Sequence, residues 1–174
     1  MGKSIRKISS KLGGGIELFC ILELEFVQGK NRKTLTSTIL NKKFKNLYMP
    51  EKLKVSYNIS EVLDNFIRGQ EKDEQLLNLL EETFDKLNNY QKINCQLIYF
   101  YFFWNFISLL GYGPELSKCV ACQQKLNPYN MYFSNKEGGI ICKNCALSKS
   151  NSVKIKSDIV KILRLILKKD WEIL

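Results

Sequence analysis

The sequence contains no histidine among its 174 residues. Because histidine is the commonest general base, its absence removes every Ser-His and Cys-His nucleophile pair. Phosphate-binding and dinucleotide-binding glycine patterns are also missing, since Gly13 to Gly15 lack the required spacing and a following Lys-Ser or Lys-Thr. Acidic pairs such as Glu81 and Glu82 are most simply solvated helix surface. The sequence therefore favours a binding module, and we expect no enzyme.

Targeting and membrane signals are weak as well. The first fifteen residues, MGKSIRKISSKLGGG, contain no apolar run that could serve in secretion, so a cytoplasmic, thiol-reducing compartment is expected. The longest apolar stretch, residues 93 to 110, includes Asn94, Gln96, Asn105 and Ser108. Its 18 residues are near the short limit for crossing about 30 Å of hydrocarbon. We expect a core helix with amphipathic neighbours rather than a membrane span.

The net charge of +10 is unevenly distributed. Residues 1 to 56 hold 12 Lys and Arg against 4 Asp and Glu, whereas residues 57 to 174 hold 15 against 13. A bias of AT-rich coding explains why 23 of the 27 basic residues are lysine, but it does not explain this asymmetry. A concentrated positive field attracts polyanions, and nucleic acid is the commonest of these in the cytosol.

Basic residues of the N-terminal third are therefore the predicted nucleic-acid contacts. The candidates are Arg6, Lys7, Lys11, Lys30, Arg32 and Lys33. The alternative is that they are ordinary solvated side chains. Phe19 and Phe26 are candidate platforms for base stacking, and core packing is an equally good interpretation of both.

The same third of the chain has the pattern of β-strands. Residues 16 to 27 alternate loosely and end in a turn-prone segment at 28 to 31, and a second strand is predicted over 34 to 40. Such a hairpin is not stable alone in water, so it must pack on something else or belong to a small barrel.

From Pro50 onward the apolar residues recur with a helical period. One helix begins at Pro50 and ends before Gly69, with Leu53, Tyr57, Ser60, Leu63 and Ile67 on its predicted apolar face. A second begins near Asp73, with Leu76, Leu77, Leu80, Phe84 and Leu87 on its predicted face. A last one spans Ser157 to about Lys169, with Ile159, Ile162, Leu163 and Ile166 facing inward.

Four of the six cysteines form two C-x2-C pairs, at Cys119 and Cys122 and at Cys142 and Cys145. A predicted hairpin over 131 to 141 brings the two pairs together as four soft ligands, the set that tetrahedral zinc prefers. A dithiol redox site and four unliganded thiols are the alternatives. With four cysteines there is no open coordination position, so the zinc is expected to be structural.

The remaining cysteines, Cys20 and Cys95, fall in a strand and in the apolar helix, respectively, where they are expected to be buried packing residues.

The stretches LLGYGPELSKCVACQ, GGIICKNCA and IRKISSKLGGGIELFCILELEFVQGK, in this order with the helices between them, resemble the bacterial DNA repair family RecO. The resemblance covers most of residues 3 to 165. It implies an α+β chain: a partial OB-like barrel segment at 1–47, a helical domain at 48–117, an embedded zinc ribbon at 118–146, and a C-terminal helix at 147–174. The family has further strands before the segment matching Arg6 and Lys7, so we expect only part of the barrel here.

The resemblance also implies a function. RecO-like proteins bind single- and double-stranded DNA, anneal complementary strands, and act with RecR and single-strand-binding protein to load RecA recombinase. We therefore expect a cytoplasmic, nucleoid-associated repair mediator. The alternative is a zinc-ribbon protein-interaction module without annealing activity.

Overall fold

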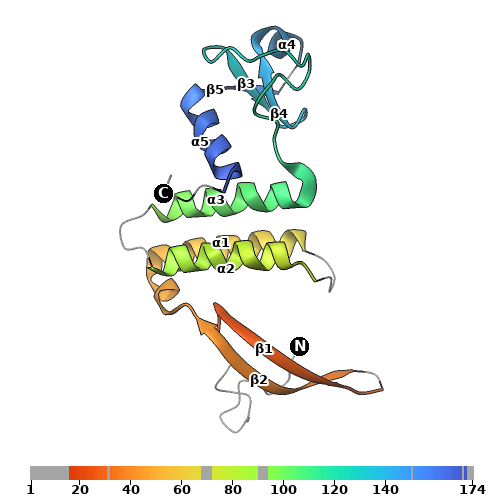
Figure 1. The fold of residues 1–174 in the computed structure, drawn as a ribbon, viewed down its shortest axis with the longest axis vertical. Helices are drawn as coiled ribbons and strands as arrows, with labels where there is room; N and C mark the ends of the chain where they lie inside the picture. The colour runs from red at the N-terminus through yellow and green to blue at the C-terminus, as the bar shows by residue number, and fades with distance from the viewer. Residues whose placement is uncertain are drawn as a thin grey trace.

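The computed structural model describes residues 16–30, 32–67, 72–89, 94–149, 151–169 and 171. The elements follow one another along the long axis of Figure 1. A β-hairpin lies at one end, helices α1, α2 and α3 lie in the middle, and a small sheet with a short helix lies at the other end beyond α5. The α+β class and the predicted order of elements are confirmed.

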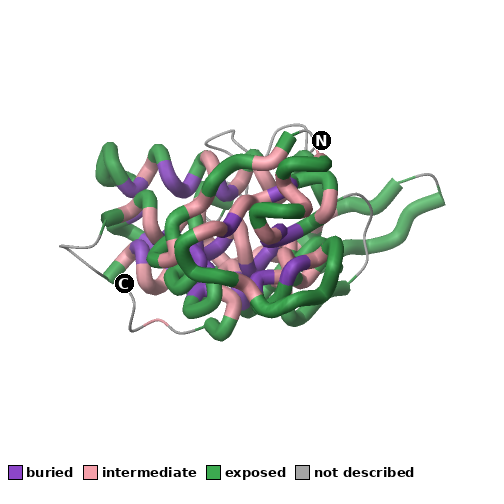
Figure 2. The backbone as a smooth tube through the Cα atoms, turned by 90° about the horizontal axis from the view of Figure 1, so that it is seen from above, coloured by how far each residue is buried: buried purple, intermediate pink, exposed green. Residues whose placement is uncertain are grey.

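The hairpin consists of β1 (Cys20–Gln28) and β2 (Lys33–Lys43), which pair antiparallel from Cys20 opposite Lys43 to Gln28 opposite Lys33. Two register shifts, at Ile21/Leu22 and at Glu25/Phe26, interrupt the ladder and increase its twist. Within the described residues this sheet has two strands only, so no closed barrel is formed. Most of both strands is exposed, as their green colour in Figure 2 shows.

The base of the hairpin packs on the helices through aromatic rings. The Phe19 ring meets Tyr48, Tyr57 and Phe84 edge to face, with centroids 6.1, 5.7 and 5.7 Å away. Phe44 is buried and packs on the same Phe84 ring. A 3-10 turn, η1 (Lys45–Tyr48), then leads into α1. The hairpin is therefore anchored at one end only.

Helices α1 (Pro50–Phe66), α2 (Glu74–Asn89), α3 (Cys95–Ile107) and α5 (Ser157–Leu167) form the main core, and α3 packs against all three others. Five residues of α3 are buried: Ile98, Tyr101, Phe102, Asn105 and Phe106. The buried Asn105 amide donates to the Tyr101 carbonyl and, across to α5, to the Ile166 carbonyl. The prediction of a central core helix is confirmed. None of the described helices is long and apolar enough to cross a membrane.

The helix starts are confirmed, but the predicted inward faces are partly wrong. The buried residues of α1 are Lys52, Val55, Ser56 and Ile59, one step around the helix from the predicted stripe. Ser56 donates to the Lys52 carbonyl, and the Lys52 amine donates to the Asn88 carbonyl at the end of α2. These bonds let polar side chains occupy a buried face. On α5, Val160 is buried, whereas the predicted Ile159 and Ile162 are exposed.

After α3 the chain turns through η2 (Ser108–Tyr112), a π-helical turn containing Gly111 at φ 87°. It then enters a module that we call the cysteine ribbon: the loop at 115–130, β3 (Met131–Ser134), β4 (Gly139–Cys142), α4 (Lys143–Ser148) and β5 (Ser152–Ile155). The strand order is β4-β3-β5, with both pairs antiparallel. The β3–β4 hairpin was predicted, whereas β5 was not.

Two contacts fix the cysteine ribbon on the helices. Arg164 of α5 donates through Nε, at 3.2 Å, and through Nη2 to the Leu116 carbonyl. Trp104 of α3 meets Phe133 of β3 edge to face, with ring centroids 6.1 Å apart. Inside the ribbon, Gly139 lies so close to the loop that a Cβ atom there would be 2.3 Å from the Glu115 carbonyl oxygen. Only glycine fits this position.

Candidate metal centre and nucleic-acid interface

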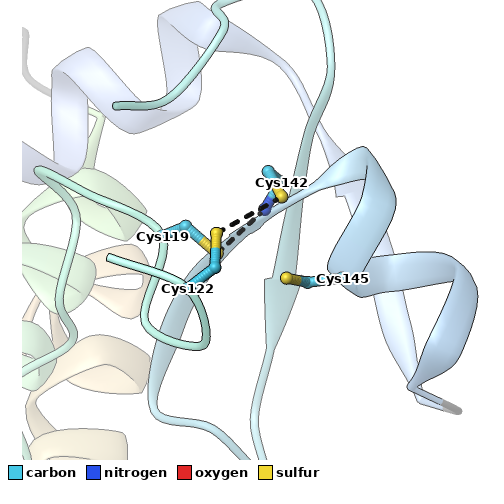
Figure 3. Close-up of side chains that lie close together, drawn as sticks. All are labelled: Cys119, Cys122, Cys142 and Cys145. Atoms are coloured by element: carbon cyan, nitrogen blue, oxygen red, sulfur yellow. Dashed lines mark hydrogen bonds between the residues drawn. The ribbon is translucent and has the colours of Figure 1, made fainter. Parts of the chain in front are cut away.

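The two cysteine pairs come from different elements. Cys119 and Cys122 lie in the loop before β3, whereas Cys142 ends β4 and Cys145 lies in α4 (Figure 3). The loop is folded into a knuckle, because the Cys119 N–H donates to the Gln124 carbonyl and the Gln123 N–H donates back to the Cys119 carbonyl. The Val120 N–H donates to the Ile140 carbonyl and so ties this knuckle to β4.

The four sulfur atoms lie within 4.8 Å of one another, as the side chains in Figure 3 show by their convergence. A tetrahedral ion with metal–sulfur bonds of about 2.3 Å requires sulfur–sulfur distances of about 3.8 Å. The Cys122 and Cys142 sulfurs are 3.8 Å apart. The cluster is therefore of the right size for one metal ion with four thiolate ligands.

Local hydrogen bonds distinguish the four thiols. Burial raises the pKa of Cys119, but backbone N–H groups of Cys122 and Cys142 outweigh it and lower that pKa to about 6. Hydrogen bonding to Cys142, followed by burial, raises the pKa of Cys145 to about 12. Backbone N–H groups therefore stabilise the thiolate form of Cys119, and the thiolate is the form that binds a metal ion.

The predicted nucleic-acid residues fall into two groups. Arg6, Lys7 and Lys11 lie outside the described residues. Lys30, Arg32 and Lys33 lie together at the tip of the hairpin, where all three are exposed. None of these three has an acidic partner within ion-pair distance in the described part of the chain.

Cations at the base of the hairpin are neutralised instead. The Lys42 amine lies 2.8 Å from Glu81 and 2.5 Å from Asp85 on α2, and Lys43 pairs with Glu17. The hydrogen bonds to Asp85 and Glu81 raise the pKa of Lys42, so its charge stays fixed in this contact. Within the described part of the hairpin, unpaired positive charge is therefore concentrated at the tip.

The two candidate stacking residues differ in position. Phe19 is half-buried in the aromatic cluster at the hairpin base and is a packing residue. Phe26, two residues before the end of β1 at the hairpin tip, is 52% exposed. Cys20 and Cys95 were expected to be buried, but both are only partly buried.

Sequence reasoning missed Arg164, which holds the cysteine ribbon to α5. The acceptor is a backbone carbonyl 48 residues away, and no residue pattern signals such a bond.

A family model described as "Recombination protein O C terminal" matches residues 50–174. The chain belongs to the RecO family. The "DNA repair protein RecO" of Dehalococcoides mccartyi is 33% identical over 169 residues, which make up 97% of this chain and 66% of that protein. RecO of Alkaliphilus metalliredigens is 28% identical over 173 residues, covering 99% of this chain and 70% of the relative.

The "DNA repair protein RecO" of Desulforamulus reducens is 25% identical over 168 residues, 96% of this chain and 64% of that protein. The chain thus spans about two thirds of the length of the RecO proteins that it resembles. These matches extend across the β1–β2 hairpin, which the family model does not include. The resemblance to the RecO family, inferred from three stretches of the sequence and the helices between them, is confirmed.

Proposed function

We propose that this chain is a DNA-binding mediator of repair and recombination, which binds single strands, anneals complementary strands and assists the loading of a recombinase. Its membership of the RecO family supports the repair role. The observation that carries the DNA contact is the tip of the hairpin, where Lys30, Arg32 and Lys33 are exposed and have no acidic partner within the described residues.

Annealing by this arrangement requires no chemical step. Two complementary strands repel each other through their phosphates, and cations at the hairpin tip reduce that repulsion. The exposed ring of Phe26 offers a stacking surface that accepts any base. Since the bases keep their pairing edges available, the protein acts by binding and not as an enzyme.

We assign structural zinc to Cys119, Cys122, Cys142 and Cys145. The size of the sulfur cluster fits this ion, and four thiolates leave no coordination position for a substrate. The ion would hold the knuckle of the loop against β4 and α4. It would thereby fix the ribbon, which is also bound to α5 where Arg164 donates to the Leu116 carbonyl.

The family also suggests partners and a place in the cell. We propose single- and double-stranded DNA as ligands, RecR-like and single-strand-binding proteins as direct partners, and RecA recombinase as an indirect one. Such a protein acts at the nucleoid, in the cytoplasm.

The test is to mix labelled complementary strands with the protein, with and without ATP, at low and moderate salt. The proposal predicts annealing that is faster than without protein, is independent of ATP and slows as salt rises. If the protein binds both strands but annealing is no faster than in its absence, the mediator function is wrong.

A second candidate is a protein-interaction module, which an apolar cleft favours. The cleft, of about 450 Å³, lies between α3, β5 and α5. Its lining residues are Leu97, Phe100, Trp104, Phe133, Val153, Lys154, Ile155, Ile159, Ile162, Leu163 and Ile166. Salt separates the two functions, because DNA binding weakens steeply with salt whereas binding in an apolar cleft does not.

A further inference from the structure

Charge counted by structural unit differs from charge counted by thirds of the sequence. Residues 50–93, which include α1 and α2, hold six Lys and Arg against nine Asp and Glu, a net charge of −3. Residues 94–174 hold eleven against five, a net charge of +6. The near-neutral C-terminal two thirds of the sequence are therefore an acidic segment followed by a second basic one.

These segments are separated in space. The hairpin lies at one end of the molecule, α1 and α2 lie in the middle, and the cysteine ribbon with α5 lies at the other end (Figure 1). Glu74, Glu81 and Asp85 of the middle segment pair with lysines. The acidic residues of α1 and α2 that have no ion pair within the described residues include Glu51, Glu61, Asp64 and Glu82. The molecule thus has two basic ends on either side of an acidic centre.

The three acidic groups of the ribbon end that the structure describes are already engaged. Glu137 pairs with Lys149 at 2.6 Å, Asp158 pairs with Lys161 at 3.2 Å, and Glu115 accepts from the Ser117 N–H. Eight exposed lysines of this end have no ion pair within the described residues: Lys118, Lys125, Lys136, Lys143, Lys154, Lys156, Lys168 and Lys169. Lysines gathered at one end of a molecule attract an external polyanion.

One pair of these lysines places two like charges opposite each other across paired segments of the chain, an arrangement that sheets usually avoid. Lys118 and Lys125 lie opposite each other in an isolated antiparallel bridge beside the first cysteine pair. Like charges in this position destabilise a fold, and such local conflicts gather at functional sites. A zinc ion with four thiolates would add a charge of about −2 nearby, which leaves the ribbon end at roughly +4.

The ribbon end also presents aromatic surface. Tyr129, in the loop between Lys125 and β3, is 84% exposed, and Phe100 of α3 is 44% exposed beside Lys154 in the cleft. Exposed aromatic rings on a surface rich in lysine are the combination that binds single-stranded nucleic acid without sequence preference.

We propose that the cysteine ribbon and α5 form a second nucleic-acid-binding surface, so that one molecule holds two single strands. This deepens the proposed function, on which it rests for the first strand at the hairpin tip. The acidic centre repels phosphates, so a strand bound at one end is not drawn along α1 and α2 to the other. Two separate contacts bring two strands into one complex, which raises their local concentration for annealing.

The decisive experiment measures bridging between two strands that cannot pair. Two oligothymidine strands, one carrying a donor dye and one an acceptor, are titrated with protein shown to be monomeric by sedimentation. Energy transfer should rise, then fall when excess protein binds each strand separately. A monomer that binds one strand but gives no energy transfer would overturn the second surface and leave the hairpin contact standing.

Paired variants locate the surface. The double variant Lys154→Gln/Lys156→Gln removes two exposed charges away from the cysteines, so its zinc content should not change. It should lower bridging severalfold while single-strand binding at the hairpin remains. The matched control, Lys54→Gln/Lys72→Gln, removes two exposed charges from the acidic centre and should bridge like the parent chain. If both double variants lose bridging equally, the effect comes from net charge alone and the proposed second surface is wrong.

Two further comparisons between variants distinguish a failure of this inference from a failure of the proposed function. Arg32→Gln/Lys33→Gln should weaken the hairpin contact yet leave salt-dependent binding at the ribbon end. If that variant loses all DNA binding, the second surface is wrong and the hairpin function stands. If it loses none while Lys154→Gln/Lys156→Gln loses all, the hairpin contact is wrong and the ribbon surface stands.

Polyglutamate is then added as a competitor. If polyglutamate displaces DNA from the ribbon end as readily as a second oligothymidine does, this surface is assigned to an acidic protein segment. That result would overturn the nucleic-acid assignment.

Discussion

The two hairpins of this molecule are built in opposite ways. β1 and β2 have 9 and 11 residues, yet large apolar side chains such as Phe26, Val27 and Ile39 are half-exposed or more. β3 and β4 have 4 residues each, and Met131, Ile140 and Ile141 are buried. Strand length therefore does not determine how firmly a hairpin is held. The long one is held at its base, and the short one by a cysteine cluster and by helices.

This difference matches the roles that we propose. A hairpin that projects from the body can reach a polyanion with its tip, whereas the ribbon is packed on the helices and carries its lysines on its surface. The following changes test the difference, beginning with the one expected to have the largest effect.

Removing one ligand should unfold the cysteine ribbon locally. Apparent zinc affinity in small modules is on the order of 10 kcal/mol, so Cys142→Ser should lose the metal and expose the amides of β3 and β4 to hydrogen exchange. Metal analysis of the parent chain should give about one zinc per chain. The control Cys20→Ser, which changes a cysteine outside the cluster, should keep its zinc. A parent chain purified without chelators that contains no zinc would contradict the assignment.

The base of the long hairpin should depend on one aromatic ring. Phe19→Ala removes edge-to-face contacts with Tyr48, Tyr57 and Phe84 and should destabilise the chain by about 3 kcal/mol. The matched control is Phe26→Ala on the exposed part of β1, with an expected cost of about 0.5 kcal/mol or less. Denaturant unfolding measures both. Equal costs would show that the hairpin is not anchored at its base.

Lys42 should make a smaller contribution that depends on pH. Its pairs with Glu81 and Asp85 are partly exposed, so Lys42→Met should cost about 1 kcal/mol or less at neutral pH. The folded state raises the pKa of Lys42, so this contribution is complete below its unfolded pKa of about 10.4 and is lost as pH rises through the folded value. The free energies of unfolding of the parent chain and the variant should therefore become equal at high pH. If the difference in unfolding free energy between the two proteins grows with pH, Lys42 does not stabilise the fold through these ion pairs.

Local signals in the sequence predicted several features correctly. Pro50 begins α1, the Asp73 carboxylate accepts from the Leu76 N–H at the start of α2, and the two cysteine pairs meet across a hairpin. Each of these depends on residues close together in the chain, or on a ligand set whose spacing is itself informative.

Features that depend on distant partners could not be predicted. β5 was missed because its pairing with β3 crosses the whole of α4, and SVKI alone does not distinguish a strand from a linker. The inward face of α1 was misjudged because Lys52 and Ser56 are buried through hydrogen bonds that hydrophobic periodicity does not register. The second basic region was hidden because a single window averaged it with the acids of α2.

The central claim is that the hairpin tip binds nucleic acid through phosphates. The most direct measurement is the affinity for a labelled single strand over a salt series, for the parent chain, for Arg32→Gln/Lys33→Gln and for the charge-matched control Lys54→Gln/Lys72→Gln. We predict that the tip variant binds all sequences more weakly and that its log-log salt slope falls by about two, whereas the control keeps the parent slope. A tip variant with the parent slope and affinity would contradict the claim.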